Sequence, residues 1–249
     1  MDSPILIPLI IGVFFLAGLV KGIIGLGLPT VALSLMTVTT NLPTAMALML
    51  VPTFTTNLLQ AVTGGHLAVV LKRIWLFLVC ATVTVWLGTL VLKDANLSLM
   101  SALLGAVLVI YALMGFSGFS FQTPSAREKP FGILLGSING ILTGMVGSYA
   151  VPGVIYLQSL GLARDPFVQA MGLLFLGSTI ALGASLSGTG LMDGEMGMMS
   201  AAATVPAIAG FFCGQAIRKR LSEALFRTLF YCGILALGLF IVVRVLLLG

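Results

Sequence analysis

The sequence contains very little charge. Only 8% of its 249 residues are Asp, Glu, Lys or Arg, and its mean hydropathy is +1.18. A soluble domain carries about a quarter charged residues. Residues 22–71, 95–126 and 130–163 contain no charged side chain. A helix needs about 20 apolar residues to cross the hydrocarbon of a bilayer. The sequence therefore excludes a soluble fold and indicates several membrane spans.

Groups that perform catalysis or bind metals are also scarce. The three cysteines lie in apolar segments without a Cys-x-x-Cys spacing, and His66 is the only histidine. There is no His-Glu-x-x-His motif, and no aspartate or glutamate lies deep in a span. A disulfide framework, a metal site and an intramembrane hydrolase are therefore not expected. We expect no cofactor and no enzymatic activity, and the net charge of +5 gives no reason to expect nucleic acid.

Eight hydrophobic segments predict an all-α integral membrane protein, because a spanning segment must satisfy its own backbone hydrogen bonds. They cover residues 4–38, 43–64, 71–92, 97–119, 131–160, 165–188, 195–217 and 224–248. The stretch Gln122–Pro130, at the middle of the chain, is predicted to be an extended loop.

The two sides of this loop resemble each other. The glycine spacing of Gly18–Gly25 repeats in Gly140–Gly147, and each cluster is followed by a proline, Pro29 or Pro152. Further matches pair Pro43, Ala47 and Thr56 with Pro166, Ala170 and Thr179. We therefore predict one membrane domain made of two repeats, residues 1–121 and 131–249, joined by the loop 122–130.

The first segment of each repeat combines glycines with a proline. Glycine weakens a helix and proline removes a backbone donor, so we expect both helices to break there. Broken backbone is tolerated in a membrane where protein or a water-filled cavity surrounds it. The alternative is close helix packing through Gly18-x-x-x-Gly22 and Gly140-x-x-x-Gly144.

The positions of Lys and Arg in the loops help to predict how many segments cross the membrane. If all eight segments cross the bilayer, Lys and Arg divide almost evenly between its two sides. If segments 4–38 and 131–160 are re-entrant hairpins, one side collects nearly all of them, and the other keeps Lys93 and Arg244. The positive-inside rule favours the second arrangement, with six full spans, two hairpins and inverted repeats. Eight full spans remain the alternative.

Inverted repeats with broken helices place substrate sites near the midplane, where half-helix N-termini offer N–H groups to an anion. Lys21 is the only charged residue deep in an apolar segment, which makes it a candidate counter-ion. The alternative is a lysine that extends to the membrane interface. The candidate substrate-binding residues are Lys21, Gly22, Gly25, Gly27, Thr56, Asn57, Asn139, Thr143, Gly144, Gly147, Ser148 and Tyr149.

Two of these candidates belong to a polar helix face. Thr53, Thr56, Asn57 and Gln60 are spaced three and four residues apart, so they share one side of a helix. Because polar groups facing lipid are costly, this side is expected to point inward. It lines either a transport pathway or a contact between helices, and the spacing does not choose between them.

The stretch Lys21–Pro29, followed by Pro43–Asn57, resembles the sulfite exporter (TauE/SafE) family of membrane transporters. The similarity extends over essentially the whole chain and includes the weaker repeat at Gly140–Pro152. The resemblance implies transport of small anions such as sulfite, thiosulfate, sulfoacetate or other organic acids. It does not itself identify binding residues.

These observations predict a secondary transporter or facilitator for a small anion, with multiple spans in a bacterial cytoplasmic (inner) membrane. Its expected partners are the anion and the lipid bilayer, and a homodimer is a possible assembly. Outward anion movement could use the membrane potential alone, worth about 2.3 kcal/mol per charge at 100 mV. The alternatives are a channel or cation carrier, which should not keep a buried ammonium on its lining, and a non-transporting membrane subunit.

Overall fold

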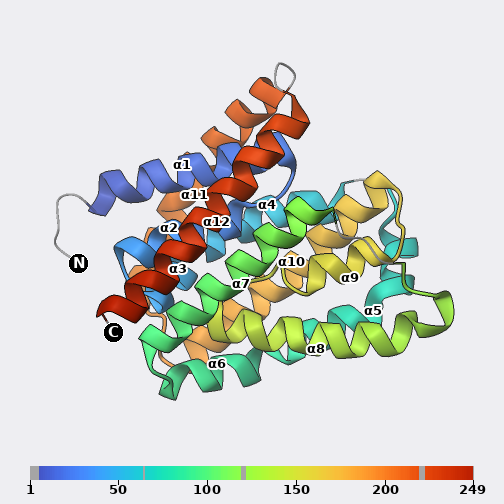
Figure 1. Ribbon diagram of the computed structural model, residues 1–249, viewed down its shortest axis with the longest axis horizontal. Coiled ribbons are helices and arrows are strands. Elements are labelled where there is room, and N and C mark those ends of the chain that lie inside the picture. The colour runs from blue at the N-terminus through green and yellow to red at the C-terminus, as the bar shows by residue number, and fades with distance from the viewer. Residues whose placement is uncertain (1–5, 64, 119–121, 219–221, 249) are drawn as a thin grey trace. The chain divides into compact units, whose positions relative to one another are not determined.

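A computed structural model describes residues 6–63, 65–118, 122–218 and 222–248 (Figure 1). Lys219 and Arg220, which entered the loop-charge argument, lie outside this range. The described residues form helices and connecting turns and contain no strand, so the predicted all-α class is confirmed. The α-helices are α1 Leu6–Ile24, α2 Leu28–Thr39, α3 Leu42–Leu48, α4 Leu50–Val62, α5 Leu67–Val83, α6 Val85–Asp94, α7 Leu97–Ser117, α8 Glu128–Val146, α9 Gly153–Ser159, α10 Arg164–Gly188, α11 Gly194–Arg218 and α12 Glu223–Leu248.

The helices are long and apolar enough for a polytopic membrane protein. In the described part of the chain, 7 helical stretches could each cross a bilayer, and α3 with α4 would make 8 as one bent span. α1 and α8 each qualify alone. The glycine breaks therefore come at the C-terminal ends of two span-length helices, near the middle of the predicted segments 4–38 and 131–160. Whether the following short helices re-enter the membrane stays a prediction.

Both first segments break where glycine and proline predicted. α1 and α2 are separated by Gly25–Gly27, and both glycines have positive φ, 90° and 107°. α8 ends at Gly147, whose φ is 72°, and α9 begins at Gly153. Residues with a side chain rarely adopt a backbone conformation with positive φ, so glycine is required at these turns.

The central loop is shorter than the sequence predicted. Residues Ser125–Arg127 form a 3-10 turn, and Glu128–Pro130 already belong to α8. Proline is tolerated in the first turn of a helix because its missing N–H would have no intrahelical partner there. The carboxylate of Glu128 also favours a helix start through the helix dipole. Pro130 therefore lies in the opening turn of α8, not in the loop before it.

By contacts, the chain divides into two compact units. Unit 1 contains residues 1–52, 97–117 and 192–249, and its main helix pairs are α1 with α11 and α7 with α12 (Figure 1). The α1–α11 contact depends on small residues. A Cβ at Gly18 would overlap the carbonyl of Ala207, and one at Gly22 would overlap that of Phe211.

Unit 2 contains residues 53–96 and 118–191. Here α8 packs against α5 and α6, and α10 against α5. A Cβ at Gly140 would overlap the side chain of Thr84, and one at Gly144 would overlap the carbonyl of Val85. The first helix of each predicted repeat thus packs through two glycines of its cluster, Gly18 and Gly22 or Gly140 and Gly144, against the third segment of the other repeat. The inverted relation of the repeats stays a prediction.

Candidate functional site

The glycine break in unit 2 has a defined backbone geometry. The N–H of Gly147 donates to the carbonyl of Thr143 at 2.8 Å, which closes the end of α8. The hydroxyl of Thr143 donates to the carbonyl of Ser148 at 3.1 Å. Thr143 and Ser148, both predicted site residues, therefore hold the chain immediately after the break, and both are buried.

Asn139 connects the two sides of this break. Its side-chain Oδ1 accepts the N–H of Gly153 at 2.9 Å, so it satisfies a donor at the start of α9. The residue is fully buried, and its Nδ2 has no hydrogen-bond partner among the described residues. A buried amide nitrogen without a partner is unusual in folded proteins and requires an explanation.

The hydroxyls of Tyr149 and Ser178, also in unit 2, likewise have no hydrogen-bond partner among the described residues. The ring of Tyr149 lies 5.9 Å from that of Phe175 on α10. The Tyr149 hydroxyl lies beside Thr179 but makes no hydrogen bond of good geometry in the described part of the chain. Ser178 precedes Thr179 on α10. Its hydroxyl is buried and has no hydrogen-bond partner in the described part of the chain.

The face of α10 that carries Ser178 lies beside the break between α8 and α9. A Cβ at Gly153 would stand 2.6 Å from Asn139 Oδ1 and 2.8 Å from a methyl of Leu174 on α10. Ser178 follows Leu174 by one helical turn, so both lie on the same face of α10. Asn139 and Tyr149 therefore lie at the break between α8 and α9, and the face of α10 that carries Ser178 packs against it. All three can donate hydrogen bonds, and none carries a charge.

The break in unit 1 has a different chemistry. Gly25 donates its N–H to the carbonyl of Lys21 at 2.7 Å, which closes α1 as Gly147 closes α8. Lys21 itself is only 2% exposed. Its side chain is thus enclosed by packing and does not extend over the protein surface. A buried ammonium beside a helix break is a candidate counter-ion for an anion.

The structure separates the roles of the predicted glycines. Gly22 and Gly144 face the backbone of a neighbouring helix, whereas Gly25, Gly27 and Gly147 form the breaks. Both interpretations of the glycine clusters therefore apply, each to different residues. Lys21, Gly22, Gly25 and Gly27 belong to unit 1, and the other candidates belong to unit 2. Their convergence on one central site stays a prediction.

The polar face of α4 points inward, as expected. Thr53, Thr56 and Asn57 are buried, and Thr56 donates to the carbonyl of Thr53 at 3.3 Å. Gln60 makes an interhelical contact, because its side chain donates to the carbonyl of Val168 on α10 at 2.8 Å. Gln169 returns the contact, donating to the carbonyl of Ala61 at 2.8 Å. This face therefore joins α4 to α10, at least at Gln60.

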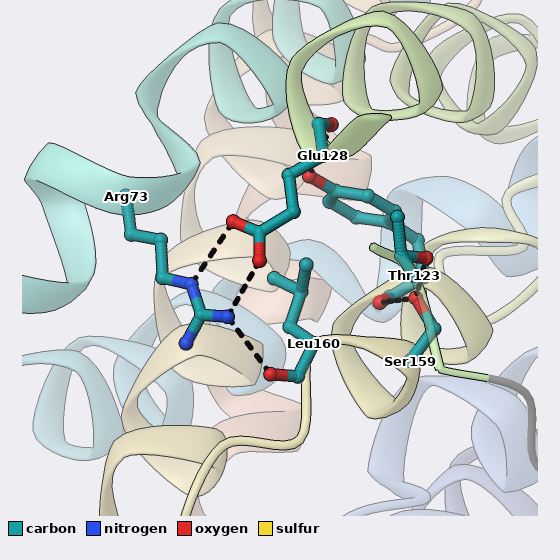
Figure 2. Close-up of polar contacts among 6 residues, drawn as sticks. Arg73, Thr123, Glu128, Ser159 and Leu160 are labelled. Carbon is teal, nitrogen blue, oxygen red and sulfur yellow. Dashed lines mark hydrogen bonds and ion pairs between the residues drawn. The ribbon is translucent and has the colours of Figure 1, made fainter. Parts of the chain in front are cut away.

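A polar clamp holds α9 at its other end (Figure 2). The guanidinium of Arg73, on α5, pairs with both carboxylate oxygens of Glu128 at 2.7 and 3.1 Å and donates to the carbonyl of Leu160 at 2.9 Å. Figure 2 also shows Thr123 beside Ser159, where the two hydroxyls lie 2.7 Å apart. The clamp fixes the start of α8 and the end of α9, on either side of the break.

The sequence did not reveal Ser178 or this clamp. Ser178 is one small polar residue among many in an apolar helix, and its missing partner becomes visible only in the packed structure. Arg73 and Glu128 are 55 residues apart, so no local spacing connects them. Among the described residues, no group of three or more His, Cys, Asp or Glu side chains could hold a metal ion.

The family model described as Sulfite exporter TauE/SafE matches residues 10–241, nearly the whole chain. The chain belongs to this family. It is thus a multi-pass membrane protein of a transporter family whose members move sulfur anions such as sulfite, in agreement with its apolar helices. No curated protein and no solved structure matches the sequence.

Proposed function

We propose that this sulfite exporter family protein moves a small anion across the cytoplasmic (inner) membrane of a bacterium, as a secondary transporter or facilitator. The cargo is a sulfur oxyanion such as sulfite or thiosulfate, or a small organic or sulfonated acid. The break between α8 and α9 binds it through Asn139, Tyr149 and Ser178, with Ser148 and Gly147 in the adjoining backbone.

The observation that carries this proposal is the set of unpartnered polar atoms at the break: Asn139 Nδ2, Tyr149 Oη and Ser178 Oγ. A buried polar group that makes no hydrogen bond costs about 1–3 kcal/mol. A ligand that accepts hydrogen bonds from all three would remove that cost. These atoms therefore favour a bound state in which an acceptor lies among them.

The same atoms favour an anion over a cation. The amide oxygen of Asn139 is turned toward the N–H of Gly153, so the atom of Asn139 left without a partner is its nitrogen. The amide nitrogen that remains is a donor only, and the two hydroxyls can turn their hydrogens toward an acceptor. Neutral donors also bind an oxyanion without burying another full charge, which would have to be desolvated.

Lys21 supports the same sign of cargo. Its ammonium is buried beside the equivalent break in unit 1, and a buried cation favours an anionic ligand in its pathway. In our proposal Lys21 acts as a counter-ion during transport. Thr56 and Asn57, on the inward face of α4, are proposed to line the pathway.

Two substitutions test the site. Ser178→Ala removes a hydroxyl that has no partner, so it should leave the fold as stable as before or slightly more so. Asn139→Asp keeps an oxygen for the N–H of Gly153 but removes the donor Nδ2. We expect both to lower the initial rate of labelled sulfite uptake into proteoliposomes by about fivefold or more, the equivalent of one hydrogen bond.

Ser185→Ala is the matched control. It makes the same change on the same helix, but the hydroxyl of Ser185 is already paired, 2.8 Å from that of Thr89. This variant should lose some stability and keep its transport rate per folded protein. If Ser178→Ala and Asn139→Asp both transport sulfite, thiosulfate and sulfoacetate at the parent rate, the break is not the binding site.

A further inference from the structure

A polar cavity lies in unit 1, away from the glycine break. It has a volume of about 290 Å³ and lies where the end of α2 and the starts of α3 and α7 meet the end of α12. Figure 1 shows these four helices packed side by side in unit 1. The polar residues that line it include Thr37, Asn41, Ser98, Ser101 and Arg244, and its lining contains no Asp or Glu.

Arg244 supplies a positive charge that is held in position. Its guanidinium donates to the carbonyl of Val38 at 2.6 Å. Val38 lies in the last turn of α2, where carbonyl groups lack intrahelical partners, so this bond both caps α2 and fixes the guanidinium. Guanidinium has five N–H donors in a planar fork that matches the oxygens of an oxyanion. Its bond to Val38 uses one of them.

Thr37 supplies an independent sign of a missing ligand. Its side chain lines the cavity and is only 7% exposed, and its Oγ1 has no hydrogen-bond partner among the described residues. The first turn of α7 adds to this, since Leu97 and Ser98 line the cavity at the start of a 21-residue helix. Such a helix start places the positive end of the helix dipole at the cavity.

From these features we infer that the unit 1 cavity binds a single oxyanion group, such as a sulfonate, a sulfate, a phosphate ester or a carboxylate. Arg244 provides the charge, Thr37 a hydroxyl donor and the start of α7 the positive end of its dipole. The volume equals that of about ten waters in the liquid, which suits one such group with some of its hydration. This site uses none of the residues proposed for transport and does not rest on that proposal.

The same chemistry could come from a free solute or from the headgroup of an anionic lipid, and two measurements separate these sources. In the first, delipidated protein in a neutral detergent is dialysed against radiolabelled sulfate at constant ionic strength. In the second, native mass spectrometry counts adducts of phosphatidylglycerol and of phosphatidylcholine. Each is repeated with Arg244→Gln, Thr37→Val and the control Arg227→Gln, which makes the same charge change near the start of α12.

We expect Arg244→Gln to weaken sulfate binding by about tenfold or more and Thr37→Val by about fivefold, as for one charged and one neutral hydrogen bond. Arg227→Gln should leave it unchanged. If sulfate binding is unaffected but the preference for phosphatidylglycerol disappears in Arg244→Gln, the oxyanion is a lipid headgroup. The inference is wrong if Arg244→Gln changes neither sulfate binding nor the preference for phosphatidylglycerol. It is also wrong if Arg227→Gln changes these two quantities as much as Arg244→Gln does.

Folding is monitored by the thermal unfolding of each variant without ligand. Thr37→Val changes no charge and replaces a hydroxyl that has no partner, so it should fold as the parent does. If Arg244→Gln does not fold, Arg244→Lys replaces it, because lysine keeps the charge and loses the planar fork. With these two variants, binding that equals the parent's in both would overturn the inference.

Discussion

The two glycine breaks share a backbone design but differ in their side chains. In both, a glycine with positive φ donates its N–H four residues back, Gly25 to Lys21 and Gly147 to Thr143. In unit 2 the break is then closed by neutral side chains, because Asn139 caps α9 and Thr143 holds Ser148. In the aligned positions of unit 1, Ala17 replaces Asn139 and Lys21 replaces Thr143.

The same glycine break therefore carries neutral donors in unit 2 and a charged side chain in unit 1. In unit 2 the polar side chains use part of their hydrogen-bonding capacity to hold the break and leave donors unpartnered. In unit 1 a buried cation stands at the equivalent point. We propose that the unit 2 break offers neutral donors to an oxyanion and that Lys21, at the unit 1 break, acts as a counter-ion during transport.

We expect the largest loss of transport when the charge at the unit 1 break is removed. Lys21→Met keeps a long apolar side chain and removes the charge, so sulfite uptake into proteoliposomes should fall by about tenfold or more, as for loss of a charged interaction. Thr143→Val, at the aligned position, should lower uptake far less, because it removes one neutral hydrogen bond. If the two variants lose uptake equally, or if Lys21→Met takes up sulfite at the parent rate, the two breaks do not have different roles.

An intermediate effect should appear in stability and be the same in both units. Gly22→Leu and Gly144→Leu place side chains against the backbone of Phe211 and of Val85. Overpacking of this kind costs about 1–3 kcal/mol or more. The unfolding free energy in mixed micelles should fall by a similar amount in both variants.

Gly12→Leu is the control for this pair, because a Cβ at Gly12 on α1 meets nothing within 4 Å. It should leave the unfolding free energy nearly unchanged. A loss as large as that of Gly22→Leu would show that the helix itself, and not the contact with α11, is sensitive to the change.

The smallest effect concerns the clamp, which belongs to the unit 2 break alone. Arg73→Gln removes the pair with Glu128 and the bond to Leu160. The Arg73 side chain is 37% exposed, so solvent and salt screen the pair and the loss should stay below about 1 kcal/mol. Thermal unfolding should show a smaller difference from the parent at high salt. Lys72→Gln, one residue earlier, is the control, and an equal change there would remove any special role for Arg73.

The sequence was sufficient for the helical class and for the positions of the breaks, because Gly25, Gly27 and Gly147 act through local backbone conformation. It could not assign Gly22 and Gly144 to packing, since that depends on which helix lies opposite. The predicted loop 122–130 was too long, because residues 128–130 form the first turn of α8, where proline is tolerated.

The candidate site was predictable only in part. Asn139, Ser148 and Tyr149 were found because they adjoin the second glycine cluster. The capping bond from Gly153 to Asn139, the isolation of Ser178 and the cavity beside Arg244 depend on distances between helices that are remote in sequence. Arg244 was seen only as a loop charge, because the partner that fixes it, Val38, is 206 residues away.

We propose that this chain moves a small anion down the membrane potential, without a buried carboxylate relay. The most direct test is uptake of labelled sulfite into proteoliposomes at equal pH on both sides, with the interior made positive by a potassium gradient and valinomycin. We predict uptake that increases with the imposed potential and is absent from protein-free vesicles. No uptake above that background, or uptake only with a pH gradient at zero potential, would contradict the account.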